Sequence, residues 1–125
     1  MINEFEIISK YFSKLSKNNN GAFNLRDDVF YDSKKKISIS VDTYNEKIHF
    51  LNFSKPDLII RRCLRASLSD LICKGISPKY YFISASGNKS HFSKLNLKKI
   101  SNALDSEQKK YSIKLSGGDT VYSKH

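Results

Sequence analysis

The residues best suited to chemistry are aspartates, which are scarce in this sequence. Of its eight Asp, five stand in recurring settings: Asp27, Asp28, Asp42, Asp70 and Asp119. Asp42 and Asp119 each directly follow a predicted strand, and ligands of an open sheet bind at such strand ends. Carboxylates that converge on one point repel one another unless cations bind there, and hard oxygen ligands favour Mg²⁺. The set predicts a magnesium site, although any one Asp taken alone is better explained as a turn or cap residue.

Three elements must position the first of these aspartates. Apolar residues at helical spacing predict an amphipathic helix over residues 3–17, ended by Asn18-Asn19-Asn20-Gly21. Residues 22–32 are expected to form a loop or a short strand. Apolar and polar residues alternate over 37–41, which predicts a half-buried strand that ends at Asp42.

The second half of the chain continues the alternation of helices and strands. An apolar stripe from Ile60 to Ile72 predicts a helix that carries Asp70 near its end and stops at Lys74-Gly75. Residues 80–85 predict a strand, and 97–104 predict another helix. A last strand is expected over 111–115, running straight into Gly117-Gly118-Asp119-Thr120. The order of elements indicates an α/β or α+β layer.

Length and composition narrow the class of protein. A chain of 125 residues, 39% of them hydrophobic, suits one domain with a single core. No stretch approaches the roughly 20 apolar residues of a membrane span, and Glu4 and Glu6 interrupt any signal peptide. Cys63 and Cys73 form no CxxC pair, which argues against a zinc site or a disulfide framework. A soluble cytoplasmic domain with no membrane partner is expected.

The net charge of +10 raises the alternative of nucleic-acid binding. That function needs basic residues focused on one face, with Arg for bidentate contacts. Here 18 of the 22 basic residues are Lys and they are spread along the chain. Nucleic acid is therefore not the expected partner.

Taken in order, the segments resemble the N-terminal half of the thiamine-monophosphate kinase family, within the aminoimidazole-ribonucleotide-synthetase-like (PurM-like) superfamily. The resemblance covers essentially the whole chain, and five motifs in order at compatible spacing carry it. They are Glu4-Phe5-x-Ile7-Ile8-x-x-Tyr11-Phe12, Asp27-Asp28, Ser40-Val41-Asp42-Thr43 with His49-Phe50, Ala66-Ser67-Leu68-Ser69-Asp70-Leu71 with Gly75 and Pro78, and Gly117-Gly118-Asp119-Thr120.

The resemblance implies a fold and an activity. The fold would be a PurM-like N-terminal domain over 1–125, with a mixed sheet packed against helices and pairing in a homodimer. The activity would be ATP-dependent phosphorylation of thiamine monophosphate to thiamine diphosphate, with Mg²⁺. By position, the metal ligands would be Asp28, Ser40, Asp42, Asp70 and Asp119, with Gly118 as a nucleotide contact and His49 as a substrate contact. No residue need act as a general base, because the accepting phosphate is already ionised.

The sequence also departs from the family pattern. Asn24, Leu25 and Arg26 replace glycines ahead of the paired acids, Val41 replaces a threonine and Ser67 an asparagine. The family's C-terminal domain, with further metal and substrate contacts, is not present in these 125 residues.

Three alternatives stay open. The chain could be a truncated or degenerate dimerisation or interaction domain without activity, or a sibling ATP-dependent enzyme of the same superfamily. His49, without the resemblance, is better explained as a core or turn histidine before Phe50.

Overall fold

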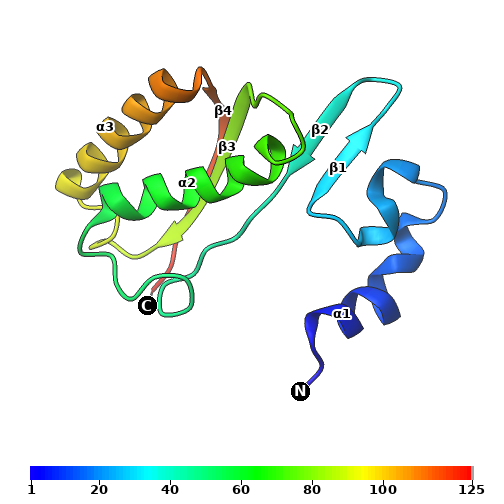
Figure 1. Ribbon diagram of the computed structural model, residues 1–125. Helices are drawn as coiled ribbons and strands as arrows, with labels where there is room; N and C mark the ends of the chain where they lie inside the picture. Colours follow the sequence, from blue (N-terminus) through cyan, green and yellow to red (C-terminus); the bar gives the residue numbers. More distant parts are fainter. Residues whose placement is uncertain (125) are drawn as a thin grey trace.

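The computed structural model describes residues 1–124 as two small sheets, two long helices and an N-terminal helical segment (Figure 1). The elements are α1 (Glu4–Ile7), η1 (Ile8–Phe12), η2 (Ser13–Ser16), η3 (Asn20–Leu25), β1 (Val29–Asp32), β2 (Ile37–Ser40), α2 (Pro56–Ile72), β3 (Tyr80–Gly87), α3 (Lys94–Tyr111) and β4 (Lys114–Tyr122). The expected mixed α/β class is confirmed, and the strands lie in two separate pairs.

The N-terminal segment is helical over the expected range, but its pitch changes along its length. A capping box starts it, since the Glu6 amide donates to Asn3 Oδ1 at 2.9 Å and the Asn3 amide donates to Glu6 Oε2. One α-helical turn then passes into π and 3-10 turns. Phe5 and Leu15 remain 81% and 76% exposed, so the apolar stripe of this amphipathic segment is largely uncovered by the described residues.

An antiparallel hairpin follows, in which β1 pairs with β2 from Val29↔Ser40 to Asp32↔Ile37. Asp32 Oδ1 stabilises its turn by accepting from the amides of Lys34 and Lys35 at 3.0 Å. Because β2 ends at Ser40, the prediction that Asp42 stands just beyond a strand is confirmed.

The helix α2 begins with Pro56 at its first turn and ends in a glycine-dependent turn. Gly75 takes a left-handed φ of +74°, and its amide donates to the Ile72 carbonyl while the Ile76 amide donates to Leu71. These two hydrogen bonds satisfy carbonyls that the helix end leaves unpaired. Asp70 therefore lies in the last turn, as predicted.

The parallel pair β3–β4 is connected through α3, and here one prediction is wrong. Tyr111 is the last residue of α3, not the first of a strand, and Ser112 closes the helix in the left-handed region at φ +55°. Tyr111 and Ile113 alternate with polar residues because both pack against the core at the turn out of the helix. The strand starts at Lys114 and continues through the Gly-Gly-Asp-Thr motif.

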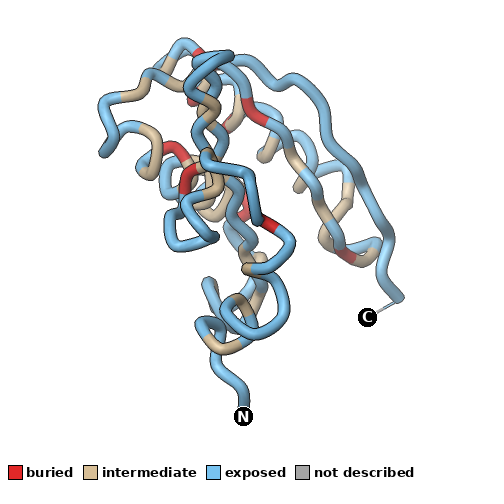
Figure 2. Tube along the Cα trace, turned by 90° about the vertical axis from the view of Figure 1, so that its right-hand side faces the viewer, coloured by how far each residue is buried: buried red, intermediate tan, exposed pale blue. Residues whose placement is uncertain are grey.

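The core lies where α2 and α3 pack side by side against β3–β4 (Figure 1). It is small, and most of the chain trace is exposed (Figure 2). Its buried centre is Leu68, Tyr81 and Ile113, against which Leu64, Ile83, Leu104 and Tyr111 pack. Within residues 1–124, no helix combines the length and apolar character needed to cross a bilayer.

A buried carboxylate joins the two long helices. Glu107 of α3 has a side chain only 1% exposed, and it accepts from Arg61 at 2.8 Å and from Arg65 at 2.7 and 2.8 Å. The hydrogen bonds from Arg65, and then the one from Arg61, hold the pKa of Glu107 below its ordinary value. Two guanidinium groups thus compensate the desolvation of one carboxylate.

Candidate functional site

Two polar contacts hold the hairpin against the C-terminal end of α2. The Ser40 hydroxyl, at the end of β2, donates to Asp70 Oδ2 at 3.2 Å. Lys74, just beyond α2, donates from Nζ to Asp27 Oδ2 at 2.8 Å, across 47 residues of sequence. In Figure 1 the hairpin accordingly stands beside this end of the helix.

Asp28 belongs to the same region. The hydrogen bond to Asp27, followed by the carboxylates of Asp27, Asp28 and Asp70, raises the pKa of Lys74. The same Lys74 hydrogen bond, with one from the Val29 amide, lowers the pKa of Asp27. We call Asp27, Asp28, Ser40, Asp70 and Lys74 the hairpin–helix cluster.

The donors of this cluster suit a hard cation. The carboxylates of Asp28 and Asp70 and the hydroxyl of Ser40 offer oxygen alone, as Mg²⁺ prefers. No three His, Cys, Asp or Glu side chains among residues 1–124 surround one point closely enough to hold a metal by themselves. That arrangement fits a magnesium ion that uses one or two carboxylates and fills its other positions with water and phosphate oxygens.

A second group of polar side chains surrounds Asp42 and His49 on the loop after β2. The Tyr44 hydroxyl lies 3.4 Å from Ser67 Oγ of α2, and its ring meets His49 edge-on at 5.6 Å. Burial raises the pKa of Tyr44, and the carboxylate of Asp42 adds to the rise. His49 is exposed, and its Nδ1 accepts from the Asn45 amide at 2.9 Å, which fixes the ring.

The same loop is anchored to the segment between β3 and α3. His91 Nε2 lies 3.3 Å from Glu46 Oε2, and the His91 ring packs edge-on against Phe53 with centroids 5.4 Å apart. Its Nδ1 accepts from the Asn88 amide at 3.1 Å. Since Nδ1 is an acceptor, the neutral ring carries its proton on Nε2, toward Glu46.

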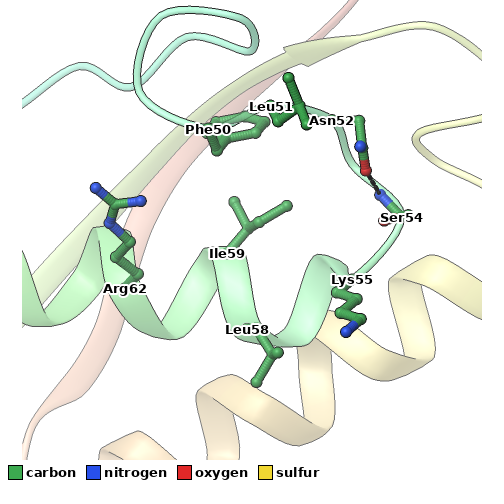
Figure 3. A pocket seen from close by; sticks show the side chains of 8 residues that line it. All are labelled: Phe50, Leu51, Asn52, Ser54, Lys55, Leu58, Ile59 and Arg62. Atoms are coloured by element: carbon green, nitrogen blue, oxygen red, sulfur yellow. Dashed lines mark hydrogen bonds between the residues drawn. The ribbon is translucent and has the colours of Figure 1, made fainter.

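A hollow of about 290 Å³ lies beside this loop at the start of α2. Figure 3 shows Ile59 pointing from α2 toward Phe50, while Leu58 points to the opposite side of the helix. Lys55 and Arg62 add positive charge to a lining that is otherwise made of apolar and uncharged polar residues. The hollow is lined by Phe50, Leu51, Asn52, Ser54, Lys55, Leu58, Ile59 and Arg62.

Asp119 and Gly118 lie elsewhere, inside β4, so the prediction that Asp119 follows a strand is wrong. Asp119 pairs with Ser84, and its Oδ1 accepts from the Thr120 amide at 2.9 Å. Gly118 has φ +151°, and a Cβ there would overlap the carbonyl oxygen of Ile83. The glycine thus lets the two strand backbones approach at an irregularity in the pairing.

Of the predicted metal ligands, the structure brings together Ser40, Asp70 and, through Lys74, the region of Asp28. Asp42 and Asp119 make their own separate contacts. The sequence prediction missed Lys74 as part of the site and treated it only as a helix end. Lys74 lies just beyond the end of α2, and its contact with Asp27 depends on how the hairpin docks, so no local pattern in the sequence signalled it.

Comparison with known proteins identifies a matching family model and several named relatives. The family model "AIR synthase related protein, N-terminal domain" matches residues 22–125. The chain is 35% identical over 121 residues to "Thiamine-monophosphate kinase" of Buchnera aphidicola subsp. Acyrthosiphon pisum, covering 94% of this chain and 37% of that protein. It is 28% identical over 124 residues to the Bacillus subtilis protein of the same name, covering 96% and 38%.

The chain thus spans well under half the length of these curated relatives. The family match extends from η3 to the C-terminus and includes all the predicted site residues. The chain belongs to the AIR synthase related protein family and corresponds to its N-terminal domain.

Proposed function

We propose that the chain is the Mg²⁺- and ATP-binding N-terminal part of a thiamine-monophosphate kinase, which phosphorylates thiamine monophosphate to thiamine diphosphate. The names of the relatives support the reaction, and the match to an N-terminal domain model, with 37–38% of the relatives' length covered, supports the part. The observation that carries the proposal is the Ser40–Asp70 contact, because it joins two motifs that lie thirty residues apart.

The proposed metal ligands are Asp28, Ser40, Asp42, Asp70 and Asp119. When bound, Mg²⁺ would offset the negative charge of the phosphates. The contact between Ser40 and Asp70 presents two oxygens side by side. Asp42 and Asp119 are exposed, so their carboxylates are free of the desolvation cost that burial brings.

The remaining roles concern the organic substrates. His49 is proposed to contact the phosphate of thiamine monophosphate, and its ring orientation is held by Asn45 and Tyr44. Gly118 is proposed to contact the nucleotide. Positioning of the two phosphates is the main task of the protein, because the acceptor needs no deprotonation. A homodimer in the cytoplasm is part of the proposal.

Titration calorimetry with Mg²⁺-ATP tests the proposal. The wild-type chain is expected to bind, and Asp42→Ala and Asp119→Ala are expected to abolish binding. Asp57→Ala, in the first turn of α2, is the control and should bind like wild type. Identical weak affinity in wild type and both site variants would contradict the proposal.

A second candidate is a domain that serves only for dimerisation or interaction. The exposed apolar side chains of Phe5, Leu15 and Phe82 favour it, being 81%, 76% and 70% exposed. It predicts a folded dimer that transfers no phosphate even when mixed with the remaining part of a complete relative. Turnover in that mixture would exclude it.

A further inference from the structure

Lys74 places a positive charge within a group of negative ones. Its Nζ is 2.8 Å from Asp27 Oδ2, and the carboxylates of Asp28 and Asp70 are near enough to act on it. The side chains of Lys74 and Asp27 are 44% and 32% exposed, so the pair is reachable by solvent ions.

The backbone fixes where this charge stands. The Lys74 amide donates to the Leu71 carbonyl at 3.0 Å, and Gly75 follows in its left-handed turn. The side chain therefore starts from an ordered helix end, four residues after Asp70. Asp27 is held in turn, since its Oδ1 accepts from the Val29 amide at 3.0 Å.

The charges of the cluster need compensation. Asp27, Asp28 and Asp70 each act electrostatically on Lys74, and carboxylates gathered in one region repel unless a cation lies among them. In the function proposed above for this chain, that cation is Mg²⁺. In this chain Lys74 already supplies one positive charge and keeps Asp27, ahead of β1, bound to the end of α2.

We propose that Lys74 is an internal counter-cation that weakens Mg²⁺ binding at the hairpin–helix cluster and keeps the hairpin docked when no metal is bound. The inference rests on the proposed function, which makes Asp28, Ser40 and Asp70 metal ligands. A divalent ion that enters beside a fixed ammonium meets repulsion that a neutral side chain would not exert. Lys74 thereby sets how much divalent cation the site requires.

Calorimetric titration with Mg²⁺ alone tests this in wild type, Lys74→Met and Lys74→Arg. Lys74→Met keeps most of the stem and removes the charge, so it is expected to bind Mg²⁺ about tenfold more tightly. Lys74→Arg keeps the charge and should match wild type. Lys79→Met, an exposed lysine outside the cluster, makes the same change in net charge and should also match wild type.

Thermal unfolding gives a second measurement that is independent of activity. In EDTA, Lys74→Met is expected to unfold about 4 °C below wild type, because the hairpin loses its ion pair to α2. Added Mg²⁺ should recover that difference in Lys74→Met. Lys74→Gln serves as a second neutral variant and should behave in the same way.

The outcomes separate this inference from the proposed function. Equal or weaker Mg²⁺ affinity in Lys74→Met, in a chain that binds Mg²⁺-ATP through Asp42 and Asp119, overturns the inference alone. If neither wild type nor the neutral variants bind Mg²⁺, both the inference and the metal part of the proposed function are wrong.

Discussion

Ser40 Oγ donates a 3.2 Å hydrogen bond to Asp70 Oδ2 and so ties the end of β2 to the last turn of α2. The two residues belong to different elements of the fold, since Ser40 ends β2 of the β1–β2 hairpin and Asp70 lies on helix α2. Their meeting positions two oxygens that the sequence places thirty residues apart. The relationship is therefore a product of docking the hairpin on the helix.

Ser40→Ala tests this contact. Removal of one partly exposed hydrogen bond is expected to lower the free energy of unfolding by about 1 kcal/mol. It is also expected to weaken Mg²⁺ binding several-fold, because one oxygen donor is lost. Calorimetry and urea unfolding measure the two effects. Ser38→Ala, two residues earlier on the same strand face, is the control, and an equal loss of Mg²⁺ affinity there would contradict a specific role for Ser40.

Gly118 and Gly75 are required for different reasons, the first for close packing and the second for its backbone conformation. Gly118→Ala is expected to cost about 3 kcal/mol or more, because the new Cβ would overlap the Ile83 carbonyl. Gly75→Ala should cost about 1 kcal/mol, since a Cβ there meets no described atom within 4 Å and only the left-handed φ is unfavourable. Urea unfolding of both variants gives the comparison. Equal costs would mean that β3 and β4 do not approach closely at Gly118.

The buried Glu107 is expected to make stability depend on pH. Its pKa in the folded chain is lowered by Arg65 and Arg61 from an ordinary value of 4.5. The contribution of Glu107 to the free energy of unfolding is therefore complete above about pH 4.5, and it is lost as the pH falls through the folded-state pKa. Unfolding curves between pH 3 and 7, roughly the range that brackets carboxyl titration, measure this.

Glu107→Gln removes that titration. At neutral pH it should destabilise the chain by about 2 kcal/mol, because two guanidinium groups lose a charged acceptor. Below about pH 4 the difference from wild type should shrink. Asp105→Asn is the control, since within residues 1–124 Asp105 pairs only with Lys109, across an exposed turn of α3. A pH dependence that Glu107→Gln leaves unchanged would assign it to other carboxylates.

Ser112→Gly is expected to stabilise the chain. Ser112 ends α3 at φ +55°, a conformation that glycine adopts without strain, so the gain should be about 0.5–1 kcal/mol. Ser101→Gly, inside the same helix, should instead cost up to about 1 kcal/mol. Opposite shifts in the midpoint of thermal unfolding check the pair. A destabilised Ser112→Gly variant would mean that the helix does not end as described.

His91→Ala tests the anchoring of the loop that carries Asp42 and His49. The variant loses the contacts to Glu46 and Phe53, so the loop should open more readily. The amides of Lys47 and His49, bonded to Phe50 and Asn45 carbonyls at 2.6 and 2.8 Å, should exchange about fivefold faster. Amides within α3 provide the internal control, and uniform acceleration throughout would indicate global destabilisation instead.

Much of the fold follows from local sequence signals. Pro56 and Gly75 bracket α2, and the alternation at Ile37–Ser40 marks β2, so the positions of Asp42 and Asp70 were predictable. The end of α3 was not, because Tyr111 and Ile113 imitate strand alternation while packing at a helix terminus. The paired glycines before Asp119 favoured a loop, whereas Gly118 serves close strand pairing.

The candidate site was predictable in its residue types and less so in its grouping. Lys74 meets Asp27 across 47 residues, a contact that depends on how the hairpin docks and that no local pattern encodes. The same holds for Tyr44 and Ser67. Asn24 and Leu25 stand where the family pattern has glycines. Yet both residues keep left-handed φ values of +55° and +59°, so the backbone shape that suits glycine persists at an energetic cost.

The separation of the strands into two pairs has a thermodynamic consequence. Because Ser40 belongs to one pair and Asp70 to the helix that covers the other, a ligand held by both oxygens binds only the docked arrangement. Binding and docking are then linked equilibria, and each increases the other by the same factor. A higher concentration of that ligand would therefore stabilise the whole domain, as an added cross-link would.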